Sequence, residues 1–239
     1  TTFFAFPAVV NRNGDFYGLY DVVEQGDKEF LDRIGLDSDN PLYKIDNPLD
    51  DAYDDVDKET RKFEDNSDLE VLIDAVNGLS QSELTDWIYR NVDVLGTVNH
   101  MAIMDLIGNR AYGPKNMYWY LDRSGTGLWS VLPWDLNMTL GAEFNPEFEP
   151  LDRLFDPRLL TDTGLLNNSN PFFRALTRSP EFRELYARRM RTLTDELFGT
   201  TNTPSGDTLV GRRIDELRRL VRDEATQDLR RWPLHPNYS

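Results

Sequence analysis

An apolar helical pattern followed at once by a strand–turn–strand pattern is the feature that most limits what this chain can fold into. Residues 92–109 are mostly apolar at helical spacing. Residues 116–122 and 128–132 are rich in aromatic and branched side chains, and the turn-forming residues 124–127 separate them. A helix joined directly to a β-hairpin excludes all-helical and all-β folds, so the sequence predicts the α+β class.

The first part of the chain carries a second hairpin pattern. The pattern predicts strands at residues 3–10 and 15–24. The turn between them ends in Asn13-Gly14, a pair typical of tight hairpin turns. Residues 28–34 then predict a short helix that Gly35 ends. A hairpin with a short helix is therefore predicted for residues 1–36.

Helical periodicity dominates the rest of the chain, so residues 69–239 are predicted to form a mainly helical unit around the central hairpin. Helices are expected at residues 69–76, after a capping box that opens at Ser80, and at residues 171–198 and 209–232.

Between these two parts, residues 37–68 are polar and dense in carboxylates. Five aspartates gather in this segment: Asp50, Asp51, Asp54, Asp55 and Asp57. A calcium loop would need the Asp-x-Asp-x-Asp-Gly pattern with a terminal Glu, and the spacing does not match it. A solvated acidic loop, inserted between the hairpin and the helical unit, is the prediction.

The composition excludes several classes of function. A net charge of −16, from 42 acidic against 26 basic side chains, argues against a nucleic acid or an anionic membrane as partner. The absence of cysteine excludes disulfides, thiolate zinc sites and a cysteine nucleophile. No apolar run is long enough to span a bilayer, and no signal peptide follows Thr1. A mature exported chain and a cytosolic chain both fit.

The sequence contains few of the motifs that mark hydrolases. Residues 78–82 lack the second glycine of a nucleophile elbow, and no His-Glu-x-x-His is present. A Ser-His-Asp triad assembles in space, so two histidines do not exclude one. A paired-carboxylate glycosidase also stays open. A hydrolase on a repurposed scaffold is therefore kept as the weaker alternative.

The candidate site lies where the central hairpin meets the helix before it. The helix pattern ends near Gly108, a short loop follows, and Asn116 leads into the first strand. The second strand ends at Asp135, after Pro133-Trp134, in a position that presents a carboxylate. Amide and carboxylate oxygens are hard ligands of the kind Mg²⁺ prefers, with phosphates completing its shell. Residues 109–135 are thus the predicted location of any chemistry, although Asn116 fits a loop cap equally well.

Several runs resemble motifs of the spore-coat protein H (CotH) kinase-like family. They are Tyr17-Gly18-Leu19-Tyr20-Asp21-Val22-Val23-Glu24, Leu42-Tyr43-Lys44, Asn116-Met117-Tyr118-Trp119-Tyr120, Leu132-Pro133-Trp134-Asp135-Leu136 followed by Gly141, and Pro180-Glu181-Phe182-Arg183 with Tyr186. The resemblance implies an atypical protein-kinase-like fold, with an incomplete small lobe that is the N-terminal hairpin and a mainly helical large lobe. It also implies phosphate transfer from ATP, with Mg²⁺ or Mn²⁺, to a protein of the spore coat or cell surface.

The resemblance assigns metal roles at the end of the central hairpin. Asn116 resembles the metal-ligand Asn of the family, and Asp135 resembles its metal-binding Asp. Asn137 stands where the family has a second Asp, which lowers the negative charge available to a metal.

Contacts to the nucleotide are implied elsewhere in the chain. Residues 24–27 resemble the hinge between the lobes, where backbone groups at Glu24 and Gly26 would meet adenine. Lys44 lies in another matching run and is a candidate phosphate contact, with an ordinary solvated lysine as the alternative.

Two departures from the family pattern bear on activity. Ala111 occupies the place of the catalytic-loop Asp, five residues before Asn116, and a methyl group cannot accept a proton. Asp105, one turn before the loop, is a candidate replacement, with a local cap or salt bridge as its alternative role. The glycine-rich loop and phosphate-binding lysine of the small lobe would also fall upstream of Thr1.

Two hypotheses follow from this pattern. The first is a divergent CotH-type phosphotransferase that binds Mg-ATP and is impaired at Ala111. The second is a pseudokinase module that acts as a binding or assembly partner. In both, the expected partner is a protein, and the expected location is secreted, on the cell surface or in the spore coat.

Overall fold

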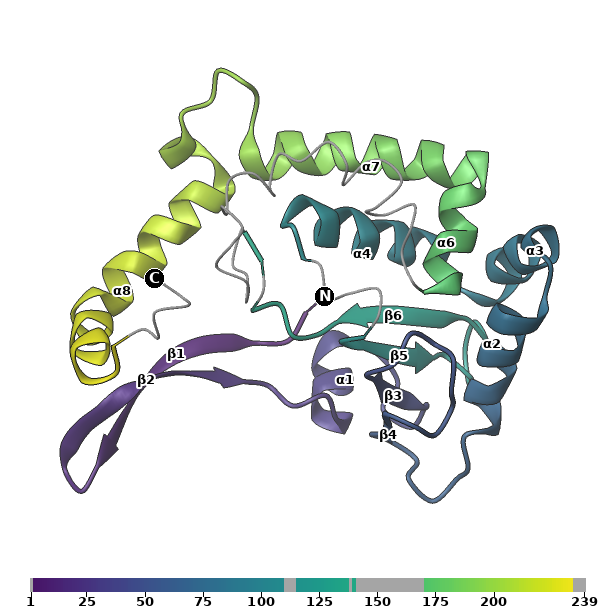
Figure 1. Cartoon of the computed structure of the whole chain (residues 1–239), viewed down its shortest axis with the longest axis horizontal. Helices are drawn as coiled ribbons and strands as arrows, with labels where there is room; N and C mark the ends of the chain where they lie inside the picture. The colour runs from purple at the N-terminus through teal and green to yellow at the C-terminus, as the bar shows by residue number, and fades with distance from the viewer. Residues whose placement is uncertain (1, 110–114, 138, 141–169, 234–239) are drawn as a thin grey trace.

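The computed structural model describes residues 2–109, 115–137, 139–140 and 170–233, and it has the predicted α+β architecture. A two-stranded ribbon stands beside a four-stranded antiparallel sheet of strand order β4-β3-β5-β6 (Figure 1). The strands are β1 (Ala5–Arg12), β2 (Asp15–Val23), β3 (Leu42–Ile45), β4 (Val56–Lys58), β5 (Met117–Leu121) and β6 (Trp129–Pro133). The helices are α1 (Lys28–Ile34), α2 (Ser67–Gly78), α3 (Gln81–Asn91), α4 (Val94–Leu106), α6 (Pro171–Arg178), α7 (Pro180–Phe198) and α8 (Leu209–Arg231).

The four-stranded sheet is buried on both faces. Met117 and Trp119 of β5 point into the larger apolar cluster, where α2, α4 and α6 pack. Tyr118 and Tyr120 point the other way, into a smaller cluster that α1 covers with Phe30. Successive side chains of a strand face opposite sides, so one aromatic run supplies both clusters.

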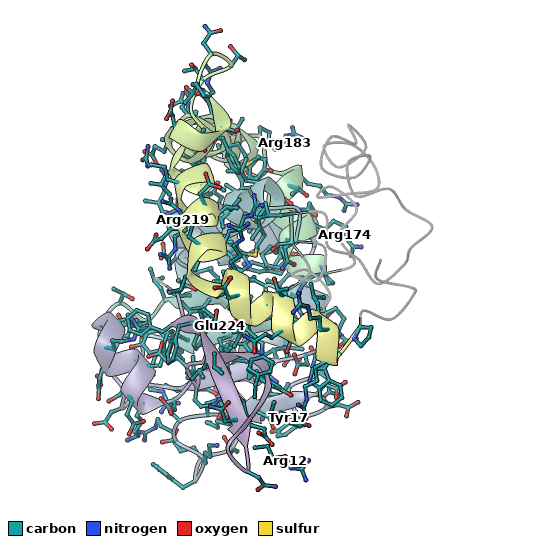
Figure 2. The ribbon with its side chains drawn as sticks, turned by 90° about the vertical axis from the view of Figure 1, so that its left-hand side faces the viewer. Arg12, Tyr17, Arg174, Arg183, Arg219 and Glu224 are labelled. Atoms are coloured by element: carbon teal, nitrogen blue, oxygen red, sulfur yellow. The ribbon has the colours of Figure 1, made fainter. Side chains whose placement is uncertain are left out.

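The ribbon of β1 and β2 turns at Asn13 and Gly14, whose φ angles of 55° and 91° are those of the tight turn expected from this pair. The end of α8 lies along its outer edge (Figures 1 and 2). Asp228 accepts a hydrogen bond from the Leu19 N–H at 2.8 Å. The indole N–H of Trp232 donates to the Tyr17 carbonyl oxygen at 2.8 Å. The end of α8 and the residue after it thus satisfy backbone groups on the outer edge of β2, the edge that faces away from β1.

Most helix boundaries follow the sequence signals. Gly35 ends α1 in the left-handed conformation, and Ser80 with Glu83 forms the predicted capping box of α3. The single helix predicted for residues 171–198 is wrong, because the chain breaks into α6 and α7 at Ser179. Pro180 has no N–H to continue α6, and it disfavours helical backbone at the residue before it. Ser179 instead caps α7, and its hydroxyl accepts from the Phe182 N–H at 3.4 Å.

The acidic segment also differs from the prediction of a solvated loop. Residues Leu42–Ile45 form a strand between β4 and β5, with Leu42, Tyr43 and Ile45 fully buried. Four of the five aspartates lie in the connection between β3 and β4, where Asp51 accepts hydrogen bonds from the N–H groups of Tyr53 and Asp54, and Asp57 lies in β4. The sequence pattern did not predict this strand, because the surrounding segment is rich in charge and the burial of Leu42, Tyr43 and Ile45 depends on pairing with distant residues of β5.

Within the described residues, no helix combines the length and apolar character needed to cross a bilayer. The segment predicted to be irregular, residues 142–170, lies outside the described residues except for Asn170.

His100 is a buried histidine of α4, 6% exposed, with its ring stacked on Phe173 at 6.1 Å between centroids. Burial lowers its pKa to about 4. An unfolded chain has an ordinary histidine pKa of about 6.5. Between about pH 6.5 and 4, His100 is therefore protonated in the unfolded chain and neutral in the folded protein. Stability should fall as pH drops from about 6.5 to 4, by about 1.4 kcal/mol per pH unit from this group. Urea unfolding across this range should show a shallower loss for His100→Gln, and equal slopes would contradict the assignment.

Candidate functional site

The β5–β6 hairpin places Asn116 and Asp135 at the same end of the sheet. Its register pairs Met117 with Pro133, so Asn116 immediately precedes the paired region and Asp135 lies just beyond it. Both residues have positive φ angles, 64° for Asn116 and 54° for Asp135. Non-glycine residues in this conformation cost on the order of 1 kcal/mol or more each and persist only where the surroundings hold them.

The neighbours of Asp135 hold it in place. Trp134 packs edge-on against Tyr118 at 5.4 Å and Phe3 at 5.0 Å, on the α1 side of the sheet. Leu136 packs into the cluster on the α4 side. The chain is therefore anchored on both sides of Asp135, whose side chain is exposed. Its carboxylate makes no hydrogen bond or ion pair with the residues that the structure describes, so it is available to a ligand.

The end of α4 approaches the same region. The Leu140 N–H donates to the Ile107 carbonyl oxygen at 2.7 Å, which ties the chain after Asp135 to this helix. Gly108 adopts a φ of 68°, and the Asn109 N–H closes the helix by donating to Met104 at 2.8 Å. The helix thus ends where the sequence predicts. Ala111, the position of the expected loop Asp, lies outside the described residues, as does Gly141.

Asp105 is held by a tyrosine from another helix. The Tyr186 hydroxyl of α7 donates to the Asp105 carboxylate at 2.9 Å. Burial, and then the negative charge of Asp105, raises the pKa of Tyr186 above its ordinary range. The phenol therefore stays protonated and acts as a donor. This contact is neither a local cap nor a salt bridge, and it ties α7 to the end of α4.

The predicted hinge residues are engaged in contacts of their own. The Glu24 carboxylate pairs with Arg33 at 2.5 Å and accepts from the Phe4 N–H at 2.9 Å. The hydrogen bond from Arg33 lowers the pKa of Glu24, and the Glu24 N–H donates to the Phe4 carbonyl oxygen at 2.9 Å. Sequence reasoning missed Arg33, because a partner nine residues away across a loop leaves no periodic signal.

Lys44 lies in β3, directly opposite Tyr118 of β5 in the sheet register. Its ammonium group pairs with Asp46 at 2.9 Å, and this hydrogen bond raises the pKa of the lysine. Lys44 is partly buried and has a carboxylate partner two residues away. It is therefore not the free, solvated lysine of the alternative, and this ion pair does not by itself indicate a phosphate contact.

The donors at the hairpin end set limits on a metal site. Among the described residues, no group of three or more His, Cys, Asp or Glu side chains could enclose a metal ion. Asp135 offers one carboxylate, Asn116 offers a buried amide, and Asn137 is exposed two residues further along. One carboxylate and amide oxygens fit a magnesium ion that arrives with phosphate and keeps several waters, rather than a closed protein cage.

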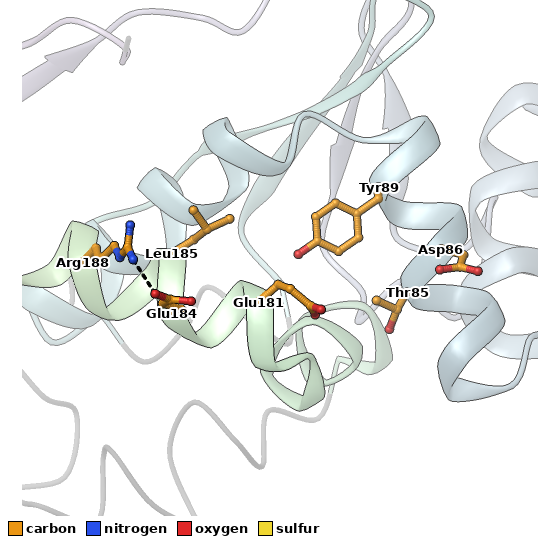
Figure 3. Close-up of a pocket in the computed structure, with 7 residues that line it drawn as sticks. All are labelled: Thr85, Asp86, Tyr89, Glu181, Glu184, Leu185 and Arg188. Atoms are coloured by element: carbon orange, nitrogen blue, oxygen red, sulfur yellow. Dashed lines mark hydrogen bonds and ion pairs between the residues drawn. The ribbon is translucent and has the colours of Figure 1, made fainter.

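A separate pocket of about 430 Å³ lies between α3 and α7 (Figure 3). Its lining residues are Thr85, Asp86, Tyr89, Glu181, Glu184, Leu185 and Arg188. Glu184 and Arg188 form an ion pair along α7. None of the predicted site residues lines this pocket, so it adds nothing to the hairpin site.

Comparison with known proteins decides the family. The family model described as "CotH kinase protein" matches residues 1–239. The chain belongs to this CotH kinase family. It is 26% identical over 208 residues to the inner spore coat protein H of Bacillus subtilis (strain 168), covering 80% of this chain and 53% of that protein. The chain therefore spans about half the length of this relative.

Gly26 provides a test of how tightly residues 24–27 pack on the hairpin. A Cβ atom at Gly26 would lie 2.5 Å from the Tyr118 ring, which is itself buried. Gly26→Ala should therefore lower the free energy of unfolding by about 1–3 kcal/mol through overpacking.

Gly78→Ala is the matched control, since no atom lies within 4 Å of a Cβ at that position. It should be neutral or stabilise by up to about 1 kcal/mol. Chemical denaturation of both variants measures the difference, and equal midpoints would show that residues 24–27 do not press on β5.

Proposed function

We propose that this chain is a CotH-type phosphotransferase module that binds Mg-ATP at the hairpin end and transfers phosphate poorly. The observation that carries the proposal is the presentation of Asp135. The backbone of Asp135 has a positive φ of 54°, and its carboxylate is exposed and has no partner among the described residues. Asp135 lies at the same end of the sheet as Asn116.

The chain's own residues supply the binding half of this chemistry. Asp135 and Asn116 would hold a divalent ion through hard oxygen atoms, and Asn137 stands nearby as a neutral donor. A bound Mg²⁺ supplies charge compensation for the phosphate oxygens in transfer. Trp134 and Leu136, partly buried against opposite clusters, keep Asp135 in place before any ligand arrives, which reduces the cost of ordering the site on binding.

The transfer half lacks a proton acceptor at the expected position. Ala111 stands where the family resemblance places the loop Asp, and a methyl side chain cannot orient or deprotonate an acceptor hydroxyl. Asp105 is the nearest carboxylate before the loop in sequence, but it already accepts from Tyr186. We therefore infer that nucleotide binding survives while transfer is slow.

The family and its relative suggest the setting. The matched relative is named an inner spore coat protein, and from this we propose a protein partner in a spore coat or on a cell surface. Secretion and the use of ATP with Mg²⁺ or Mn²⁺ belong to the same proposal.

A pseudokinase module for binding or assembly is the second candidate function. It is favoured by two substitutions that act in the same direction, Ala111 for the loop Asp and Asn137 for a second carboxylate. Both remove charge that transfer would use, and neither removes Asp135. The two candidates differ in one measurable property, the rate of transfer once nucleotide is bound.

Mg-ATP should raise the melting temperature of the protein, and Asp135→Ala should abolish that rise. A ligand at a hundred times its Kd stabilises by about 2.7 kcal/mol, which is about 5–10 °C for a chain of this size. A thermal-shift titration with ATP, with and without Mg²⁺ or Mn²⁺, measures it. Asp223→Ala is the matched control, because Asp223 is an exposed carboxylate of α8.

A shift that needs the metal and is lost only in Asp135→Ala supports the site. A shift of the same size in both variants would place the nucleotide elsewhere. The absence of any shift in the parent protein would contradict the proposal.

Restoring the loop carboxylate should restore transfer. Ala111→Asp should increase phosphate release from ATP, or autophosphorylation, by about 100-fold or more, the usual range for a positioned base. Ala111→Asn is the matched control, because it has nearly the same shape and cannot take a proton. Radiolabelled γ-phosphate transfer measures all three proteins. Equal inactivity of Ala111→Asp and Ala111→Asn, with both variants still binding Mg-ATP, would contradict the phosphotransferase proposal and support the pseudokinase module.

A further inference from the structure

β6 is an edge strand of the four-stranded sheet, and one stretch of its outer edge has no partner. The Asp122 N–H donates inward to the Leu128 carbonyl oxygen at 3.0 Å, whereas the Trp129 carbonyl oxygen accepts from the Asp93 N–H outside the sheet at 2.8 Å. Backbone groups alternate in direction along an antiparallel strand. The N–H and the carbonyl of Val131, two residues after Trp129, therefore both point outward. Neither group is hydrogen-bonded on that side within the described part of the chain.

A cavity of about 550 Å³ runs along this edge. Ile103 and Met104 of α4 line it from one face of the sheet, and Ile34 and Leu36 line it from the other. Val131 lies between these two apolar walls. The cavity thus wraps around the strand edge, with a backbone donor and acceptor in its middle.

The cavity is formed in advance, because hydrogen bonds pin its walls at both ends. The bond from Asp93 to Trp129 joins the start of α4 to the start of β6. At the other end, the Leu140 N–H reaches the Ile107 carbonyl oxygen at 2.7 Å, beyond the last residue of β6. These two bonds fix the position of α4 relative to the hairpin, and the cavity is present without a ligand.

We propose that this cavity binds a small, flat, uncharged heteroaromatic molecule that carries a hydrogen-bond acceptor next to a donor. The N–H and C=O of a strand lie in the plane of the sheet, so a ligand that bonds both must lie in that plane. The apolar walls then cover its two faces, as in most small-molecule sites. The carboxylate that lines the cavity, Asp93, caps the start of α4 by accepting from the Gly96 N–H at 2.9 Å. Most of the other lining side chains are apolar, which favours an uncharged ligand.

An extended peptide fits this edge less well than a small molecule. The Trp129 carbonyl is occupied by Asp93, and Pro133 has no N–H to donate. Only Val131 therefore offers both groups, and a pairing peptide strand would need several such residues in succession. The inference does not depend on the proposed nucleotide site, because none of these contacts uses Asp135 or Asn116.

The test uses 7-azaindole as the probe, because its ring nitrogen and N–H are adjacent and its rings are flat. Isothermal titration calorimetry should show saturable binding with a Kd on the order of 1 mM, the affinity expected for so small a molecule. The 1-methyl derivative has the same rings without the donor. It should bind at least about fivefold more weakly, as expected for the loss of one hydrogen bond.

Filling the cavity should remove binding. Leu36→Trp blocks it from the α1 side and Ile103→Phe from the α4 side, so a folding failure in one variant leaves the other. Leu95→Trp is the matched control, because Leu95 is 66% exposed on α4 and does not line the cavity. Far-ultraviolet circular dichroism verifies that each variant is folded.

The proposal is supported if both filling variants weaken 7-azaindole binding at least tenfold, the control does not, and Mg-ATP leaves the affinity unchanged. It is overturned if no saturable binding occurs below 10 mM, or if the methylated probe binds equally well. Binding that survives in a folded filling variant, or that Mg-ATP displaces, would also overturn it.

Discussion

The burial of β5 on both faces is the constraint on which the rest of the structure depends. Four of its five residues are buried, with Met117 and Trp119 in one apolar cluster and Tyr118 and Tyr120 in the other. Each cluster recruits helices from a different part of the chain. The α1 side holds the N-terminal segment through Phe3 and Phe30, stacked at 4.0 Å, and the α4 side holds α2, α4 and α6. Because both clusters end at the same hairpin, the position of Asp135 is set by the packing of nearly the whole protein.

The strained backbone at the hairpin end is a consequence of that packing. Trp134 belongs to one cluster and Leu136 to the other, so the residue between them must project away from both. A positive φ at Asp135 costs on the order of 1 kcal/mol, which is small against the burial of the two large side chains on either side. Backbone strain of this kind clusters at ligand sites, where the surrounding structure holds a side chain in place before a ligand binds.

Charge is distributed unevenly along the chain. Residues 1–170 carry 32 acidic and 13 basic side chains, whereas residues 171–239 carry 10 acidic and 13 basic ones. The hairpin site lies in the strongly acidic part, where a bare nucleotide would be repelled over distances of about a Debye length. A divalent ion bound with the phosphates offsets that repulsion, so the same charge that disfavours nucleic acid also predicts that ATP binds only together with a metal.

The sequence by itself determined the elements with local signals. The Asn13-Gly14 turn, the Gly35 helix end, the capping box at Ser80 and the hairpin from Asn116 to Asp135 all depend on neighbouring residues, which sequence patterns report directly. Tertiary structure alone decided the rest. Residues Leu42–Ile45 became a strand because β5 was available to pair with them. The cavity along β6 depends on how α4 packs beside the hairpin, a placement that two hydrogen bonds between residues distant in sequence help to fix. Partners such as Arg33 for Glu24 and Tyr186 for Asp105 belong to the same class. Their contacts join residues that no periodicity connects, and only the folded chain brings them together.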